Sequence, residues 1–166
     1  LTPALAASER TTAVTVAVDA AADRRPISPL IYGLNYATTE QMADLRATLN
    51  RRGGNPTTRY NWQQNVDNRA SDYFFESLPL SSGSAPGADA DDFVASTRAG
   101  GGEPIITIPT VGWVAKLGPN RERLASFSVA KYGPQQRTDQ YFPDAGNGVG
   151  HIGVLTSAQR AQRFGR

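Results

Sequence analysis

The stretch from Arg51 to Asn65 carries side chains suited to binding a sugar. It begins beside a Gly pair and holds three Asn, two Gln, one Tyr and one Trp. Asn and Gln amides both donate and accept hydrogen bonds, which matches the needs of sugar hydroxyls. A flat aromatic ring covers the apolar face of a pyranose, so amides beside aromatic rings are typical of a carbohydrate cleft. The candidate contacts here are Asn55, Tyr60, Asn61 and Trp62.

A second candidate contact, Trp113, follows the apolar run Ile105–Ile108. If that run is a barrel strand, Trp113 stands at the carboxyl end, where the active sites of such barrels lie. A structural interpretation competes at both places. In that interpretation the Asn side chains satisfy turns and the two Trp rings fill the core.

Acidic residues that could cleave a glycosidic bond are missing from the expected positions. Glycoside hydrolysis normally uses a pair of Asp or Glu side chains flanking the scissile bond. The five Glu residues fall at a terminus, in a helix first turn, at the amino end of a strand, or in loop or helix contexts: Glu9, Glu40, Glu103, Glu76 and Glu122. We therefore expect no catalytic residue within this chain.

Other catalytic chemistries have little support. The chain has no Cys and one His, His151, which excludes thiolate zinc sites and a His-rich metal centre. A Gly-x-Ser-x-Gly nucleophile motif is absent. The run Gly100–Gly102 follows an expected helix and precedes an expected strand, which is the reverse of a dinucleotide-binding loop.

Charge and hydropathy argue against nucleic acid and membrane partners. The formal net charge is +2, and 15 of the 17 cationic residues are Arg scattered along the chain. Nucleic-acid binders usually show a clustered basic stripe supported by a motif. No apolar run approaches the roughly 18 residues that a membrane span needs.

The elements that would position these residues alternate between strands and helices. The spacing predicts strands at Ile31–Asn35, Thr58–Trp62 and Ile105–Ile108, with helices over about 40–50 and 90–98. Thr38 and Gln41 have the spacing of a capping box at the first helix. Strands that alternate with helices favour an α/β fold with adjacent parallel strands.

The length is too short for a closed barrel. A complete (β/α)8 barrel needs about 250 residues, whereas this chain has 166. Residues 115–166 show little periodicity, and a long structureless tail argues against a complete compact domain. The fold expected is a partial TIM barrel of about three strands, preceded by a separate alternating strand at Val14–Val18.

Several ordered motifs resemble glycoside hydrolase family 44 over about residues 12–149. The similar segments are Ile27–Gly33, Arg52–Asn55, Thr58–Trp62, Asn68–Tyr73, Ile106–Pro109 with Gly112–Val114, Phe127–Gln135 and Tyr141–Gly148. The resemblance implies a TIM barrel with an accessory β-sandwich. It also implies retaining hydrolysis of β-1,4-glucans such as cellulose and xyloglucan.

In that family the acid/base and the nucleophile are Glu residues on the fourth and seventh strands, which would lie beyond Arg166. The resemblance places Asn55, Tyr60, Asn61, Trp62 and Trp113 along the glycone side of the cleft. No cofactor is implied. Structural calcium is possible, although residues 150–166 contain no acid where the family has a calcium-binding loop.

The expected organisation follows from these observations. Residues 1–11 would be a processed or disordered N-terminus, because Ala4-Leu5-Ala6 fits the end of a signal peptide and fits a frayed Ala-rich terminus equally well. The expected location of the hydrolase is extracellular. Residues 12–29 would belong to the accessory β domain, 30–114 to the barrel, and 115–166 to a long excursion with an atypical tail from about 150. Two functions are compatible: part of a secreted glucanase completed by the rest of the barrel or a second chain, or a non-catalytic glycan-binding or interaction module.

Overall fold

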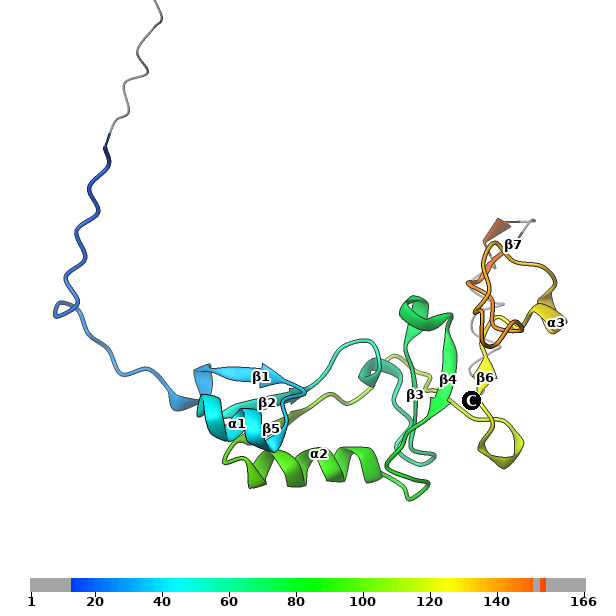
Figure 1. Ribbon diagram of the computed structural model, residues 1–166, viewed down its shortest axis with the longest axis horizontal. Helices are drawn as coiled ribbons and strands as arrows, with labels where there is room; N and C mark the ends of the chain where they lie inside the picture. Colours follow the sequence, from blue (N-terminus) through cyan, green and yellow to red (C-terminus); the bar gives the residue numbers. More distant parts are fainter. Residues whose placement is uncertain (1–12, 151–152, 155–166) are drawn as a thin grey trace, which may run out of the picture.

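The computed structural model describes residues 13–150 and 153–154. The predicted processed N-terminus, His151 and most of the atypical tail after residue 150 lie outside these residues. Figure 1 shows a parallel sheet with a long helix beside it and, to their right, the antiparallel strands and then the C-terminal loops.

The first sheet is parallel and has three strands in the order β1-β2-β5. Its strands are Gly33–Asn35, Leu49–Arg52 and Glu103–Ile106. Asn35, Arg51 and Ile105 share one level of the sheet, because Arg51 is the register partner of the other two. The predicted parallel arrangement of an α/β fold is therefore confirmed for this part of the chain.

Two helices connect the strands of this sheet, and one of them was predicted closely. Helix α2 spans Ala88–Ala99 and ends at Gly100, in agreement with the helix expected over 90–98. Helix α1 spans Thr39–Leu45 and begins with the predicted capping box. It ends well before residue 50, because Arg46 adopts a left-handed conformation and the chain turns into β2.

The predicted middle strand was wrong. Thr57–Arg59 forms a 3-10 turn, η2, and not part of a strand over Thr58–Trp62. The strand between β1 and β5 is instead Leu49–Arg52, which lies in and beyond the region expected to be helical. Its buried side chains are polar, so its sequence lacks the apolar pattern that marks a buried strand.

A second sheet, unforeseen in the sequence, is antiparallel with the order β3-β4-β6. Its strands are Val66–Asn68, Glu76–Pro79 and Leu124–Ala125. The 3-10 turn η3, Ala70–Tyr73, joins the first two. This sheet interrupts the barrel pattern between β2 and β5.

Residues after 115 contain few regular elements, as expected. Besides β6, they comprise η4, α3 and the hairpin β7–β8, which span Pro119–Arg121, Val129–Tyr132, Val149–Gly150 and Gly153–Val154. Within the described part of the chain, no helix is long and apolar enough to cross a membrane.

The strand expected at Val14–Val18 is not formed among the described residues. Val14, Val16 and Val18 are each more than three-quarters exposed, and no segment of residues 13–150 pairs with them. A strand needs a partner to satisfy its backbone. The next element is the short 3-10 turn η1, Pro29–Ile31, just before β1.

Candidate functional site

The carboxyl end of the parallel sheet leads into the loop that the sequence singled out. Strand β2 ends at Arg52, and the loop from Gly53 to Asn65 crosses that edge before β3 begins. Helix α2 starts at the same edge, because Arg52 reaches the first turn of α2 at Asp89. In α/β proteins, ligands bind at this edge of the strands.

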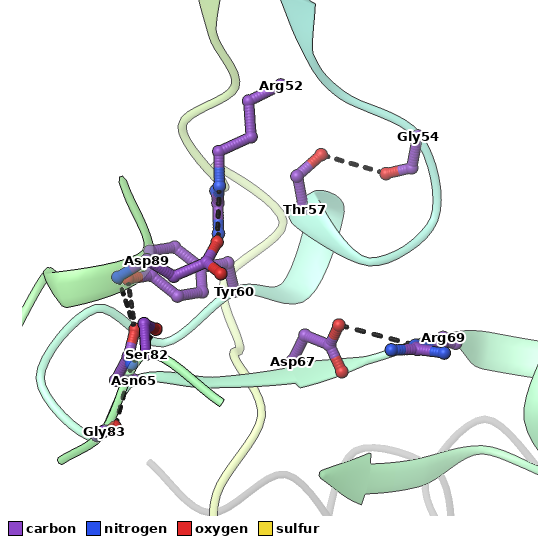
Figure 2. Close-up of polar contacts among 10 residues, drawn as sticks. All are labelled: Arg52, Gly54, Thr57, Tyr60, Asn65, Asp67, Arg69, Ser82, Gly83 and Asp89. Atoms are coloured by element: carbon purple, nitrogen blue, oxygen red, sulfur yellow. Dashed lines mark hydrogen bonds and ion pairs between the residues drawn. The ribbon is translucent and has the colours of Figure 1, made fainter. Parts of the chain in front are cut away.

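A buried polar cluster ties the loop to helix α2 (Figure 2). The Arg52 side chain is 2% exposed, and its Nε and Nη2 donate to Asp89 Oδ2 at 2.8 and 2.5 Å. The guanidinium carbon lies 4.1 Å from the centre of the Tyr60 ring. A buried guanidinium needs a counter-charge, which the Asp89 carboxylate provides. The face of the Tyr60 ring contacts the guanidinium from a second side.

Tyr60, a predicted sugar contact, belongs to this cluster. Its ring is buried, and its hydroxyl donates to Asn65 Oδ1 at 2.8 Å. The same oxygen accepts from the Asp89 backbone N–H, so Asn65 links the tyrosine to the start of α2. Burial raises the pKa of Tyr60 because the phenolate would be poorly solvated. Tyr60 thus fastens the loop to the helix.

Asn61 also holds the loop in place, and it links the loop to the segment that carries Trp113. Its Nδ2 donates to the Ala115 carbonyl at 2.8 Å. Its Oδ1 accepts from the backbone N–H groups of Gln63 and Gln64 at 3.0 and 3.3 Å. Both predicted regions therefore meet, although they are about 50 residues apart in the sequence.

The two Trp residues differ in exposure. Trp62 is 59% exposed, so its ring does not fill the core. Trp113 is half-buried, with the Arg59 guanidinium stacked 4.7 Å from the ring centre. Their proposed contact with sugar stays a prediction.

Asn55, the remaining predicted contact, is exposed beyond the glycine pair. Its Nδ2 donates to Asp72 Oδ2 of the 3-10 turn η3. Close by in sequence, Asp67 is almost fully buried, and its Oδ2 lies 3.5 Å from Arg69 Nε. Burial raises the pKa of Asp67, although the Arg69 charge acts in the opposite direction. Figure 2 shows Asp67 on β3 and Arg69 just beyond its end, apart from the Arg52 cluster.

Sequence reasoning missed a buried carboxyl pair. Glu76, expected in a loop or helix, is the first residue of β4 and is fully buried. Burial and the nearby Asp139 carboxylate raise the pKa of Glu76 to about 7. Arg123 approaches its Oε1 at 3.5 Å. The Glu76 and Asp139 side chains link β4 to the later loops. Both are buried, so neither is open to a substrate. No local sequence pattern marks this contact, because the two residues are far apart in the chain.

No metal centre is evident in the described part of the chain. No group of three or more His, Cys, Asp or Glu side chains there is arranged to hold an ion. The sequence expectation about structural calcium concerned residues 150–166, most of which lie outside the described range.

Comparisons with known proteins confirm the family that the sequence resembles. A model of glycoside hydrolase family 44 matches residues 66–164. Endoglucanase A of Paenibacillus lautus is 30% identical over 116 residues, which are 62% of this chain and 16% of that protein.

Two solved structures extend the likeness to the fold. CelM2, a bifunctional glucanase-xylanase from a metagenome library, superposes with a TM-score of 0.76 at 55% identity. That match covers 81% of this chain and 26% of CelM2. A Paenibacillus polymyxa xyloglucanase of the same family gives a TM-score of 0.53 at 29% identity, over 69% of this chain and 23% of that one.

The chain therefore spans about a quarter or less of the length of these relatives, which are an endoglucanase, a glucanase-xylanase and a xyloglucanase. The family match covers more than half of the chain, and it includes β3, η3, β4, α2 and β5. The chain belongs to glycoside hydrolase family 44 and represents a fragment of its catalytic domain.

Proposed function

We propose that this chain forms part of a secreted retaining β-1,4-glucanase that acts on cellulose and xyloglucan. The observation that carries the proposal is the carboxyl edge of the parallel sheet. There the loop after β2 joins the Trp113 segment through Asn61, beside the exposed ring of Trp62. An exposed aromatic ring among amides suits a glucan chain.

The chain supplies the wall of the cleft, and the two carboxyl groups come from the rest of the barrel or from a second chain. In retaining hydrolysis one carboxylate attacks the anomeric carbon and forms a covalent bond. The glycosidic bond breaks, and its oxygen takes a proton from the second carboxyl group. Water then releases the sugar, with the second group acting as base. The reaction needs no cofactor, so calcium would have only a structural role.

A chimera tests the proposal. Residues 13–150 replace the matching part of CelM2, and reducing-sugar release is measured on carboxymethyl-cellulose and xyloglucan. We expect activity within about tenfold of CelM2, because 55% identity and a shared fold preserve the contacts with the remaining strands. A chimera that folds, shown by its circular dichroism spectrum and cooperative unfolding, but hydrolyses neither glucan would contradict the proposal.

The second candidate is a non-catalytic glycan-binding module. It is favoured by one observation: Glu76 is fully buried within residues 13–150 and so is not open to a ligand. The isolated 166-residue chain distinguishes the two. Calorimetric titration with cello-oligosaccharides would show binding without hydrolysis if the chain works alone. We expect neither hydrolysis nor micromolar binding, because half a cleft loses much of the contact area.

A further inference from the structure

The exposed Trp62 ring stands on a short turn that other parts of the chain hold by its backbone. The turn covers residues 62–65, and the backbone groups of Asn61 and Val66 close it with hydrogen bonds of 2.9 and 3.2 Å. At the start of the turn, the Trp62 carbonyl accepts from the Gly87 N–H at 2.7 Å. Because the ring is exposed, its position depends on what fixes the backbone of this turn.

A side chain from far along the sequence fastens the other end of the turn. Arg121 Nη1 donates to the Gln64 carbonyl at 2.7 Å. Its Nη2 donates to the carbonyls of Asn65 and Gly83 at 3.5 and 3.3 Å. The Gly83 carbonyl also accepts from Asn65 Nδ2 at 2.9 Å (Figure 2). A guanidinium group presents several donors in one rigid plane, so Arg121 holds the turn and the Gly83 loop together.

The segment that carries Arg121 is itself shaped to deliver this side chain. The Gly118 N–H donates to the Glu122 carbonyl at 2.8 Å, which closes the segment into a loop. Leu117 N–H donates to Gln64 Oε1 at 3.0 Å and ties the same loop to the turn a second time. Arg121 has a left-handed backbone, with φ of 61°, which is uncommon for a residue other than Gly. Such a conformation persists only where the surrounding contacts impose it.

The contacts of the Arg121 guanidinium are with backbone carbonyls and not with a carboxylate. The three ion pairs within residues 13–150 involve other Arg residues: Arg52, Arg69 and Arg123. Hydrogen bonds from a charged donor are stronger than those between neutral groups. Because these bonds end on the backbone of the turn, they fix its conformation.

We propose that Arg121 is a positioning residue for substrate binding, which fixes the 62–65 turn so that the Trp62 indole is held ready to stack on a sugar ring. This inference rests on the proposed function, in which Trp62 contacts the glucan. A ring that is already oriented loses less conformational freedom when the sugar binds, so the affinity is higher. Arg121 acts through Trp62 and does not itself touch the sugar.

A double-mutant cycle in the CelM2 chimera tests the proposal. The cycle consists of Arg121→Met, Trp62→Ala and the two together. Arg121→Lys is the conservative variant, and Lys116→Met is the matched control, because it removes an exposed cation from the same segment. For each protein we measure the affinity for a cello-oligosaccharide by calorimetric titration, KM and kcat on xyloglucan, and the thermal midpoint.

We expect Arg121→Met to weaken oligosaccharide binding and to raise KM by about twofold to tenfold, the range that corresponds to ordering one side chain. The value of kcat should be nearly unchanged, as it is when binding alone is lost. Arg121→Lys should lie between Arg121→Met and the parent, because an ammonium group cannot bridge several carbonyls in one plane. Lys116→Met should match the parent.

The decisive comparison is between the double variant and Trp62→Ala. If Arg121 acts through the ring, its loss should weaken binding no further once Trp62 is absent. Additive losses in the double variant would overturn the proposal and assign Arg121 a purely structural role. Parent-like binding in Arg121→Met would also overturn it. If Arg121→Met does not fold, Arg121→Lys takes its place in the cycle with the same criteria.

Failure of the proposed function gives a different result. An inactive parent chimera, or a Trp62→Ala variant that binds oligosaccharide as the parent does, would remove the glucan contact on which this inference rests. Both the proposed function of this edge and the role of Arg121 would then be overturned together.

Discussion

Trp62 is an exposed aromatic residue in a loop whose other aromatic residue, Tyr60, is buried. Tyr60 and Asn65, on either side, are buried and hydrogen-bonded to each other, whereas the Trp62 ring is 59% exposed. Its carbonyl accepts from the Gly87 N–H at 2.7 Å, so the backbone is fixed while the ring is open. A ring held in this way can bind a ligand without losing much conformational entropy.

We predict that Trp62→Ala in the chimera weakens cello-oligosaccharide binding about tenfold and leaves stability almost unchanged. A sugar face on an indole removes on the order of 50–100 Å² from water, scaled down from full aromatic burial. At about 25 cal/mol per Å² this is roughly 1–2.5 kcal/mol. Calorimetric titration measures the affinity.

The control for this variant is Tyr32→Ala, which removes an exposed aromatic ring before the amino end of β1. Its affinity for oligosaccharide should equal that of the parent. Equal affinity in Trp62→Ala, or cooperative unfolding of that variant at a much lower temperature, would assign the ring a structural role.

The Arg52–Asp89 pair is the charge pair on which the loop depends. We predict that Asp89→Ala lowers the free energy of unfolding by about 2–4 kcal/mol, because it leaves a buried guanidinium without a counter-charge. Asp91→Ala removes an exposed carboxylate from the same helical turn, and it should change the free energy of unfolding by less than about 0.5 kcal/mol. Urea unfolding of both variants compares them, and equal effects would contradict the importance of the pair.

Glu76 makes stability depend on pH in a defined direction. Its pKa in the folded protein is raised to about 7 from 4.5, so folding favours the protonated form. The stabilisation is complete below about pH 4.5 and is lost as pH rises through 7. We predict a fall in the free energy of unfolding of up to about 3 kcal/mol across that window.

The matched variant for this prediction is Glu76→Gln, which mimics the protonated carboxyl group. Its stability should fall less than that of the parent between pH 4.5 and 7, and the slope that remains belongs to Asp67, whose pKa burial also raises. Asp139 does not interfere, because backbone N–H groups of Tyr141 and Phe142 lower its pKa and it titrates below the window. The same slope in Glu76→Gln as in the parent would show that another group titrates.

At the scale of elements, helix α1 depends on its first turn. It has seven residues and one buried side chain, Met42, so capping contributes much of its stability. The Thr38 hydroxyl oxygen accepts from the Gln41 N–H, and the Gln41 side-chain Oε1 accepts from the Thr38 N–H. We predict that Thr38→Ala costs about 1 kcal/mol.

Thr38→Ser retains the capping oxygen, so it should lower the free energy of unfolding by only a few tenths of a kcal/mol. Urea denaturation of the two variants measures the difference. If the serine variant loses as much stability as the alanine variant, the methyl group and not the cap supports the helix.

Local signals predicted the elements that local contacts define. The capping box at Thr38 and the acidic start and glycine end of α2 depend on residues within one turn, and both were placed well. Strand β2 was missed for a different reason. Its buried face is Asn50 and Arg52, and their partners, Thr97 and Asp89, are more than 35 residues away.

The predicted site shows the same limit. Sequence composition identified the loop and Trp113 as one polar, aromatic region, and Asn61 does join them. It could not separate Tyr60, which is buried against Arg52, from Trp62, which is open. The alternation of residue types along the chain predicts which face of a strand each side chain is on. Whether Tyr60 or Trp62 is buried depends on packing against residues far away in the sequence.

For the whole molecule, the parallel sheet has two free edges, β1 and β5, within the described residues. Exposed apolar side chains flank both, including Ile31 near β1 and Ile108 beyond β5. Unpaired strand edges in water favour association with further strands. The match to about a quarter of CelM2 is consistent with a sheet that continues on both sides in the complete enzyme.

The most direct measurement is the crystal structure of the CelM2 chimera with a cello-oligosaccharide bound. The sugar chain should cross the carboxyl ends of β1, β2 and β5, with one pyranose ring stacked on Trp62. An oligosaccharide bound at the amino ends of these strands, or more than about 10 Å from Trp62, would contradict the assignment of this edge as part of the glucan cleft.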